Sequence, residues 1–104
     1  MYNVRMIQLG KVKFEWDEEK ERLNKHKHRI TFGEAATIFL NTPLQVFFDP
    51  DHSDSEDRFI AIGISLHSRT LVVIHCESQS GTVVRIISAR KATKREQKRL
   101  HGGK

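Results

Sequence analysis

Hydrophobic and polar residues alternate along several short stretches of this chain, as they do in half-buried β-strands. In the first stretch, residues 11–16, the apolar positions are Val12, Phe14 and Trp16. The same signal predicts further strands over residues 44–48, 58–64, 69–77 and 82–90. Short polar turns separate the last three of these strands, so we expect hairpins and an antiparallel sheet.

Helix capping signals predict two helices between the first and second strands. Asp17 is a good N-cap for a charged helix that runs to about residue 27. Thr31 and Glu34 form a capping box ahead of an apolar stripe with helical spacing. Residues 41–43 end this second helix, because a proline disfavours helical geometry in the residue before it.

A third helix is expected at the C-terminus, where Thr93 and Glu96 repeat the capping box. The whole order predicts an α+β domain. Its antiparallel sheet carries two N-terminal helices on one face and ends in a short basic C-terminal helix. Residues 1–10 show no period and are expected to be an N-terminal extension, residues 11–101 one domain, and residues 102–104 a tail.

Positive charge is concentrated in the last fifth of the chain. Residues 85–104 contain eight Lys or Arg and one Glu, whereas residues 1–84 contain ten Lys or Arg and twelve Asp or Glu. The formal net charge of +5 therefore comes from one C-terminal element. Such a concentration is typical of a surface that binds a polyanion, and nucleic acid is the first candidate.

The remaining composition narrows the class of protein. The single cysteine, Cys76, lies in an apolar run and is interpreted as a core residue, which favours a reducing cytoplasm. No apolar run reaches the ~20 residues of a membrane span. His26 and His28 have neither a cysteine pair nor a carboxylate at ligand spacing beside them, so we expect no metal and no cofactor.

The alternation along the predicted strands brings together a candidate catalytic group. One side of the last three strands is apolar and is expected to face the helices. The other side carries Arg85, His75 and Glu77 on an open face. An arginine there could hold a phosphate, and His or Glu could move a proton to or from a ribose hydroxyl. A polar outer face without chemistry is the alternative.

Cations near the third helix are candidates for contacts to phosphates along a nucleic-acid backbone. They are Arg90, Lys91, Lys94, Arg95, Lys98 and Arg99. The helix N-terminus beside Thr93 adds partial positive charge. A solvated helix, or a docking site for an acidic protein, would have the same composition.

Short motifs in a fixed order cover most of the chain from residue 14 to about residue 99. They are residues 14–17 with Lys20 and Asn24, 27–28 with 30–32, 34–36, 58–63, 71–75, and 85–93 with Glu96. In order and spacing they resemble the BrnT family of bacterial type II toxins, small ribonucleases of RelE-like fold that a BrnA antitoxin neutralises. Arg29, where the family usually has glycine, and Leu100, where many members have tyrosine, depart from the pattern.

The resemblance implies a metal-independent endoribonuclease that inhibits translation and growth. In this sequence Arg58 and Arg85 would clamp the scissile phosphate, and Lys27 or His28 would assist proton transfer. The flanking RNA backbone would be held by Arg90 and Lys91. Lys20, Lys94 and Arg95 would contact the same backbone. The implied partner is a ribbon-helix-helix antitoxin. The toxin would reach operator DNA only as part of the complex with this antitoxin. The alternative is a basic module that binds nucleic acid or a partner without catalysis.

Overall fold

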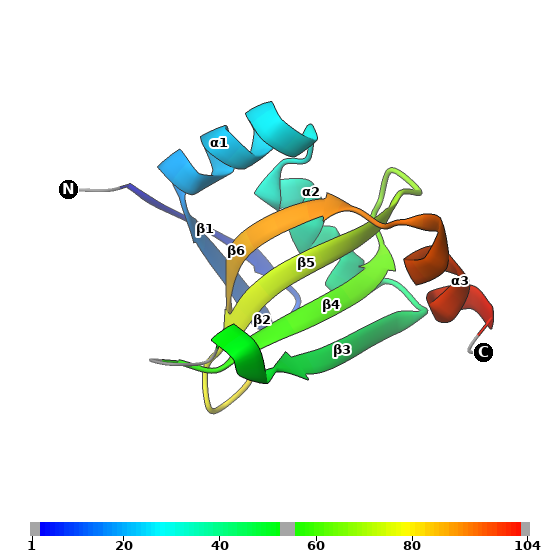
Figure 1. The fold of residues 1–104 in the computed structure, drawn as a ribbon. Helices are drawn as coiled ribbons and strands as arrows, with labels where there is room; N and C mark the ends of the chain where they lie inside the picture. The colour runs from blue at the N-terminus through cyan, green and yellow to red at the C-terminus, as the bar shows by residue number, and fades with distance from the viewer. Residues whose placement is uncertain (1–2, 53–55, 103–104) are drawn as a thin grey trace.

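The computed structural model describes residues 3–52 and 56–102, and within these ranges a six-stranded mixed sheet forms the body of the protein (Figure 1). The strand order across the sheet is β1-β2-β6-β5-β4-β3. The strands are β1 (Val4–Leu9), β2 (Val12–Asp17), β3 (Leu44–Asp49), β4 (Arg58–Ile64), β5 (Thr70–Glu77) and β6 (Val83–Lys91). The helical segments are α1 (Glu18–His28), α2 (Phe32–Ala36), the 3₁₀ turns η1 (Thr37–Leu40) and η2 (Pro50–His52), and α3 (Lys94–Gly102).

The sheet is mixed because β2 runs parallel to β6, with Phe14 opposite Val84 and Glu15 opposite Arg85. All other neighbouring strands are antiparallel. The prediction of an antiparallel sheet is therefore wrong at this one pairing. Hairpin turns fix the direction of β4, β5 and β6, but β2 and β6 are far apart in sequence and no turn relates them.

The first strand, β1, was not predicted. Residues 4–9 pair with residues 12–17 across a turn at Gly10, whose φ of 63° suits glycine. They therefore belong to the sheet and are not an extension ahead of it. Val4 and Met6 are about half exposed, 49% and 57%, so the strand lacks the buried side that produces an alternating pattern. Residues 1–2 and 103–104 lie outside the described residues, and Gly102 ends α3.

Both faces of the sheet are covered in part. The larger core lies between the sheet and α2 with η1, and it contains Phe14, Trp16, Phe32, Ile38 and Val73 among its buried members. The smaller core lies on the other face, where Leu100 of α3 packs with Ile62 and Val72. Figure 1 shows α2 behind the sheet and α3 at the end of β6. Leu100, one of the departures from the family pattern, is thus a packing residue.

One buried side chain fastens α1 to the centre of the sheet. The Asn24 amide nitrogen donates to the carbonyls of Ile30 and Ala89, at 3.1 and 2.8 Å, and its oxygen accepts from the Ala89 N–H at 3.1 Å. These bonds hold the helix against β6. They also place the side of α1 that carries Lys20 over that strand.

The two capping boxes form to different degrees. At α3, the Glu96 N–H donates to the Thr93 hydroxyl and the Thr93 N–H donates to the Glu96 carboxylate, as the sequence predicts. At α2, the Thr31 hydroxyl accepts from the Glu34 N–H, but the Glu34 side chain binds Arg69 and Ser65 instead of returning to Thr31. The Arg69 guanidinium is the main reason that the pKa of Glu34 is lowered.

Candidate functional site

Two arginines share one face of the sheet because directly paired residues on neighbouring strands point to the same side. Asp49 of β3 is opposite Arg58 of β4, and Arg58 is opposite Cys76 of β5. Cys76 is opposite Arg85 of β6, which is opposite Glu15 of β2. This cross-strand row places two guanidinium groups on either side of a buried thiol, with a carboxylate at each end.

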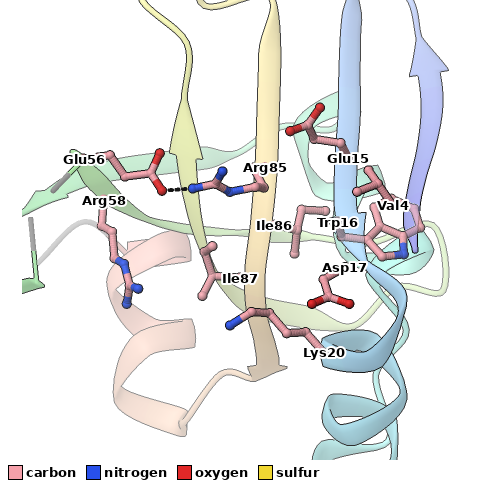
Figure 2. Close-up of a pocket in the computed structure, with 10 residues that line it drawn as sticks. All are labelled: Val4, Glu15, Trp16, Asp17, Lys20, Glu56, Arg58, Arg85, Ile86 and Ile87. Carbon is pink, nitrogen blue, oxygen red and sulfur yellow. Dashed lines mark ion pairs between the residues drawn. The ribbon is translucent and has the colours of Figure 1, made fainter. Parts of the chain in front are cut away.

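A pocket of about 350 Å³ opens above this row, and we call it the arginine pocket (Figure 2). Arg58 and Lys20 reach into it from β4 and α1, with Ile87 between them, and Arg85 enters from β6. Its lining residues are Val4, Glu15, Trp16, Asp17, Lys20, Glu56, Arg58, Arg85, Ile86 and Ile87. Three cations from three elements thus converge on one space.

The Arg85 guanidinium forms an ion pair with Glu56, just before β4 (Figure 2). The two side chains are 42% and 48% exposed, so water screens their attraction. A pair of this kind is worth little, and an incoming phosphate can replace the carboxylate on the guanidinium. Glu56 comes from the acidic segment that precedes β4, and the structure brings its side chain to the pocket.

A second, shallower pocket of about 230 Å³ adjoins the first and shares Lys20 and Ile87 with it. We call it the α1 pocket. Its lining residues are Lys20, Leu23, Asn24, Lys27, His28, Ile87 and Ser88. Lys27 and His28 are therefore beside the arginines on a continuous cleft between α1 and β6, but not in the same pocket.

His75 does not share the open face with Arg85, so this part of the predicted arrangement is wrong. Glu77, in contrast, lines a small pocket of about 190 Å³ together with Arg85 and Glu15. A register irregularity between Ile74 and His75 pairs His75 with Ile86, a core residue, while Cys76 pairs with Arg85. The His75 side chain is completely buried, in edge contact with Phe39 at 5.0 Å between ring centroids. Its Nε2 atom is 2.8 Å from the Glu77 carboxylate.

The assignment of strand faces is wrong for β4 and β5, but right for β6, where Val84 and Ile86 face the helices. The helix-facing side of β5 carries Leu71, Val73 and His75, whereas Ile62 and Val72 pack on the side of the arginines. Both sides of these strands are apolar over part of their length. Alternation alone therefore could not show which side meets α2.

The C-terminal cations differ in how they are held. Arg90 makes two bonds of 2.8 Å to the Glu96 carboxylate, which orients its guanidinium and lowers the pKa of Glu96 to about 2. Lys91, Lys94 and Arg95 are exposed, and none of the ion pairs found over residues 3–52 and 56–102 involves them. These three side chains are thus available to an anionic partner.

Across the described part of the chain, no three His, Cys, Asp or Glu side chains are grouped as metal ligands would be. Burial raises the pKa of the Cys76 thiol, which makes it a poor nucleophile, although Arg58 opposes the shift. Among the described helices, none combines the length and apolar character that a membrane crossing requires.

Fold and site together define a small α+β protein that gathers arginines and lysines along one cleft. Residues 16–96 match the family described as ribonuclease toxin, BrnT, of type II toxin-antitoxin system. The chain therefore belongs to the BrnT family of ribonuclease toxins. The crystal structure of the Brucella abortus ribonuclease toxin BrnT is similar, with a TM-score of 0.57 and 25% sequence identity over 76% of this chain and 94% of that one. Among curated proteins, none matches the sequence.

Proposed function

We propose that this protein is a RelE-like, metal-independent endoribonuclease, the toxin of a type II toxin–antitoxin pair. The observation that carries the proposal is the cross-strand row, in which Arg58 and Arg85 face the same pocket as Lys20. Three cations over one apolar residue, Ile87, form a site for a single phosphate that carries adjoining sugars and bases. By cutting RNA in the cytoplasm the toxin inhibits translation and growth.

Cleavage proceeds by attack of a ribose 2′-hydroxyl on the adjacent phosphorus, in line with the departing 5′-oxygen. Arg58 and Arg85 bind the non-bridging oxygens and stabilise the negative charge that develops on them. One preorganised donor of this kind lowers the activation barrier by ~3 kcal/mol. Lys27 or His28 contacts the RNA on the α1 side and assists proton transfer.

The flanking RNA follows the cations on both sides of the arginine pocket. Lys20 belongs to both pockets and holds the strand between them. Lys91, Lys94 and Arg95 hold the backbone beyond β6. Arg90 adds a guanidinium that Glu96 keeps in place.

The partner is a BrnA-like antitoxin with a ribbon-helix-helix DNA-binding part. It covers the cationic cleft and so excludes RNA. The toxin reaches operator DNA only through this complex, which binds its own operator.

Digestion of RNA by the purified protein in EDTA tests the proposal. We expect cleavage to persist in the chelator and to fall at least ~100-fold in Arg85→Ala. Arg5→Ala is the matched control, because Arg5 lines neither the arginine pocket nor the α1 pocket and forms an ion pair with Glu18. RNA that is bound with a steep salt dependence but left intact would instead support a non-catalytic binding module.

A further inference from the structure

The carboxylates that line the arginine pocket differ in whether they have bonding partners. Glu56 pairs with Arg85, and Asp17 caps α1 by accepting the Glu19 N–H at 2.9 Å. Glu15 lines the same pocket, but within residues 3–52 and 56–102 its carboxylate has no hydrogen bond or ion pair. It is partly buried, at the β2 end of the cross-strand row. Of the described carboxylates that line this pocket, Glu15 is thus the one that is free to contact a ligand.

The position of Glu15 relative to the arginines suits work on a bound ribose. Glu15 is opposite Arg85 on the neighbouring strand, so their backbones are ~4.8 Å apart. Figure 2 shows Glu15 on the side of β2 toward β6, while the Arg85 guanidinium extends away from it to Glu56. A phosphate bound by Arg85 can direct its attached sugar toward β2, where Glu15 lines the same pocket.

The groups around Glu15 leave its carboxylate available. Met6 faces it from β1 and Arg85 from β6. Along β2, Lys13 and Asp17 point to the same side as Glu15. Asp17 is committed to the helix cap, and Lys13 is exposed.

We propose that Glu15 is the general base of the RNA cleavage described above, an inference that rests on that proposed function. The Glu15 carboxylate takes the proton of the ribose 2′-hydroxyl as the 2′-oxygen bonds to phosphorus. The bond from phosphorus to the 5′-oxygen breaks, and this oxygen leaves with a proton that Lys27 or His28 supplies and then regains from solvent. Glu15 then returns its own proton to solvent. The products are a 2′,3′-cyclic phosphate and a 5′-hydroxyl, and no net proton is consumed.

No other carboxylate or imidazole near the cleft fits this role as well. His28 lines only the neighbouring α1 pocket. His75 is buried on the opposite face. Glu77 shares a small pocket with Glu15 and Arg85, but its carboxylate is held by the bond to His75. Glu56 contacts the guanidinium that the phosphate needs, so substrate binding displaces it.

The variant Glu15→Gln tests the proposal by removing the base while keeping its shape. In single-turnover cleavage of an RNA oligonucleotide we expect a loss of at least ~100-fold in rate. Binding of a 2′-O-methyl oligonucleotide, which cannot be cleaved, should not weaken. The acid limb of the wild-type pH–rate profile, produced by protonation of the base, should disappear in the variant.

Two further variants serve as controls. Glu19→Gln makes the same change of charge on the exposed side of α1, outside both pockets, and should keep the wild-type rate. Glu15→Asp keeps the carboxylate but withdraws it, and should lose part of the rate while retaining the acid limb. Circular dichroism and thermal unfolding establish that each variant is folded.

The outcomes separate this inference from the proposed function. Wild-type protein that cleaves RNA together with Glu15→Gln that cleaves it equally fast overturns the role of Glu15 alone. A slow Glu15→Gln variant that keeps the acid limb also overturns it, because Glu15 would then only position the substrate. Wild-type protein that leaves RNA intact overturns both proposals.

Discussion

Glu56 and Arg85 form an ion pair across the arginine pocket, between the residue two positions before β4 and the middle of β6. The carboxylate covers part of the guanidinium that a phosphate would bind. Both side chains are nearly half exposed, so the pair is weak. In the proposed function this carboxylate competes with an RNA phosphate for Arg85.

Removing this competitor should tighten RNA binding. We expect Glu56→Gln to lower the Kd for a 2′-O-methyl RNA oligonucleotide about threefold to fivefold, which corresponds to an exposed pair of up to ~1 kcal/mol. Filter binding at low and physiological salt measures the change. Weaker binding by the variant would mean that Glu56 supports Arg85 in its binding position.

Loss of the Asn24 amide should destabilise the whole protein. Asn24→Ala leaves the N–H and C=O of Ala89 and the carbonyl of Ile30 without their partner in a buried site. We expect the free energy of unfolding to fall by about 3 kcal/mol, as measured by urea denaturation. Asn41→Ala is a matched control that removes a single half-buried bond, to the Ile64 carbonyl, and should cost about 1 kcal/mol. Equal losses would show that the three bonds of Asn24 stabilise the protein no more than the single bond of Asn41.

Replacing Arg29 by glycine should stabilise the protein. Arg29 ends α1 in the left-handed conformation, with φ of 63° and ψ of 28°, where glycine has no steric penalty. The free energy of unfolding should rise by about 0.5–1 kcal/mol in Arg29→Gly. The same substitution at His26, in the exposed interior of α1, should lower it by about 1 kcal/mol. Thermal denaturation of the two variants gives the opposite signs directly, and destabilisation by both would contradict this account of the turn.

Acid should weaken the attachment of α3. Arg90 lowers the pKa of Glu96 from its ordinary 4.5 to about 2, with help from the backbone of Thr93. A carboxyl with a lowered folded-state pKa stabilises the protein above its unfolded-state pKa, and the stabilisation is lost as the pH falls from about 4.5 toward 2. Allowing for solvent screening, we expect ~1–2 kcal/mol.

Urea denaturation of the wild type and Glu96→Gln at several pH values measures this contribution. The difference between the two proteins should be largest at neutral pH and should shrink toward pH 2. Glu34, whose pKa is also lowered, contributes in the same direction in both proteins and cancels in the comparison. A difference that is constant with pH would assign the effect of Glu96 to its neutral hydrogen bonds.

Local signals in the sequence predicted most of the individual elements. The N-caps Asp17, Thr31 and Thr93 begin the three helices, and the strands from β2 to β6 are found within one residue of their predicted bounds. These signals depend on neighbouring residues only. The strand β1 was missed because its exposed side chains give no pattern.

Relationships between distant segments could not be predicted in the same way. The parallel pairing of β2 with β6 brings Glu15 to Arg85, and nothing in either strand specifies the other as a neighbour. The irregularity after Ile74 reverses which residues share a face, and it removed His75 from the site. Arg58 and Arg85 were nevertheless placed together by the family resemblance, which draws on a fold that these strands alone do not define.

The position of β6 between β2 and β5 has a consequence for the timing of toxicity. During synthesis the earlier parts of a chain emerge and begin to fold first. Until residues 83–91 are made, the two walls of the cleft have no strand to join them, and Arg85 does not yet exist. The growing polypeptide therefore has no complete arginine pocket until β6 is made, and any activity of that pocket begins only late in synthesis.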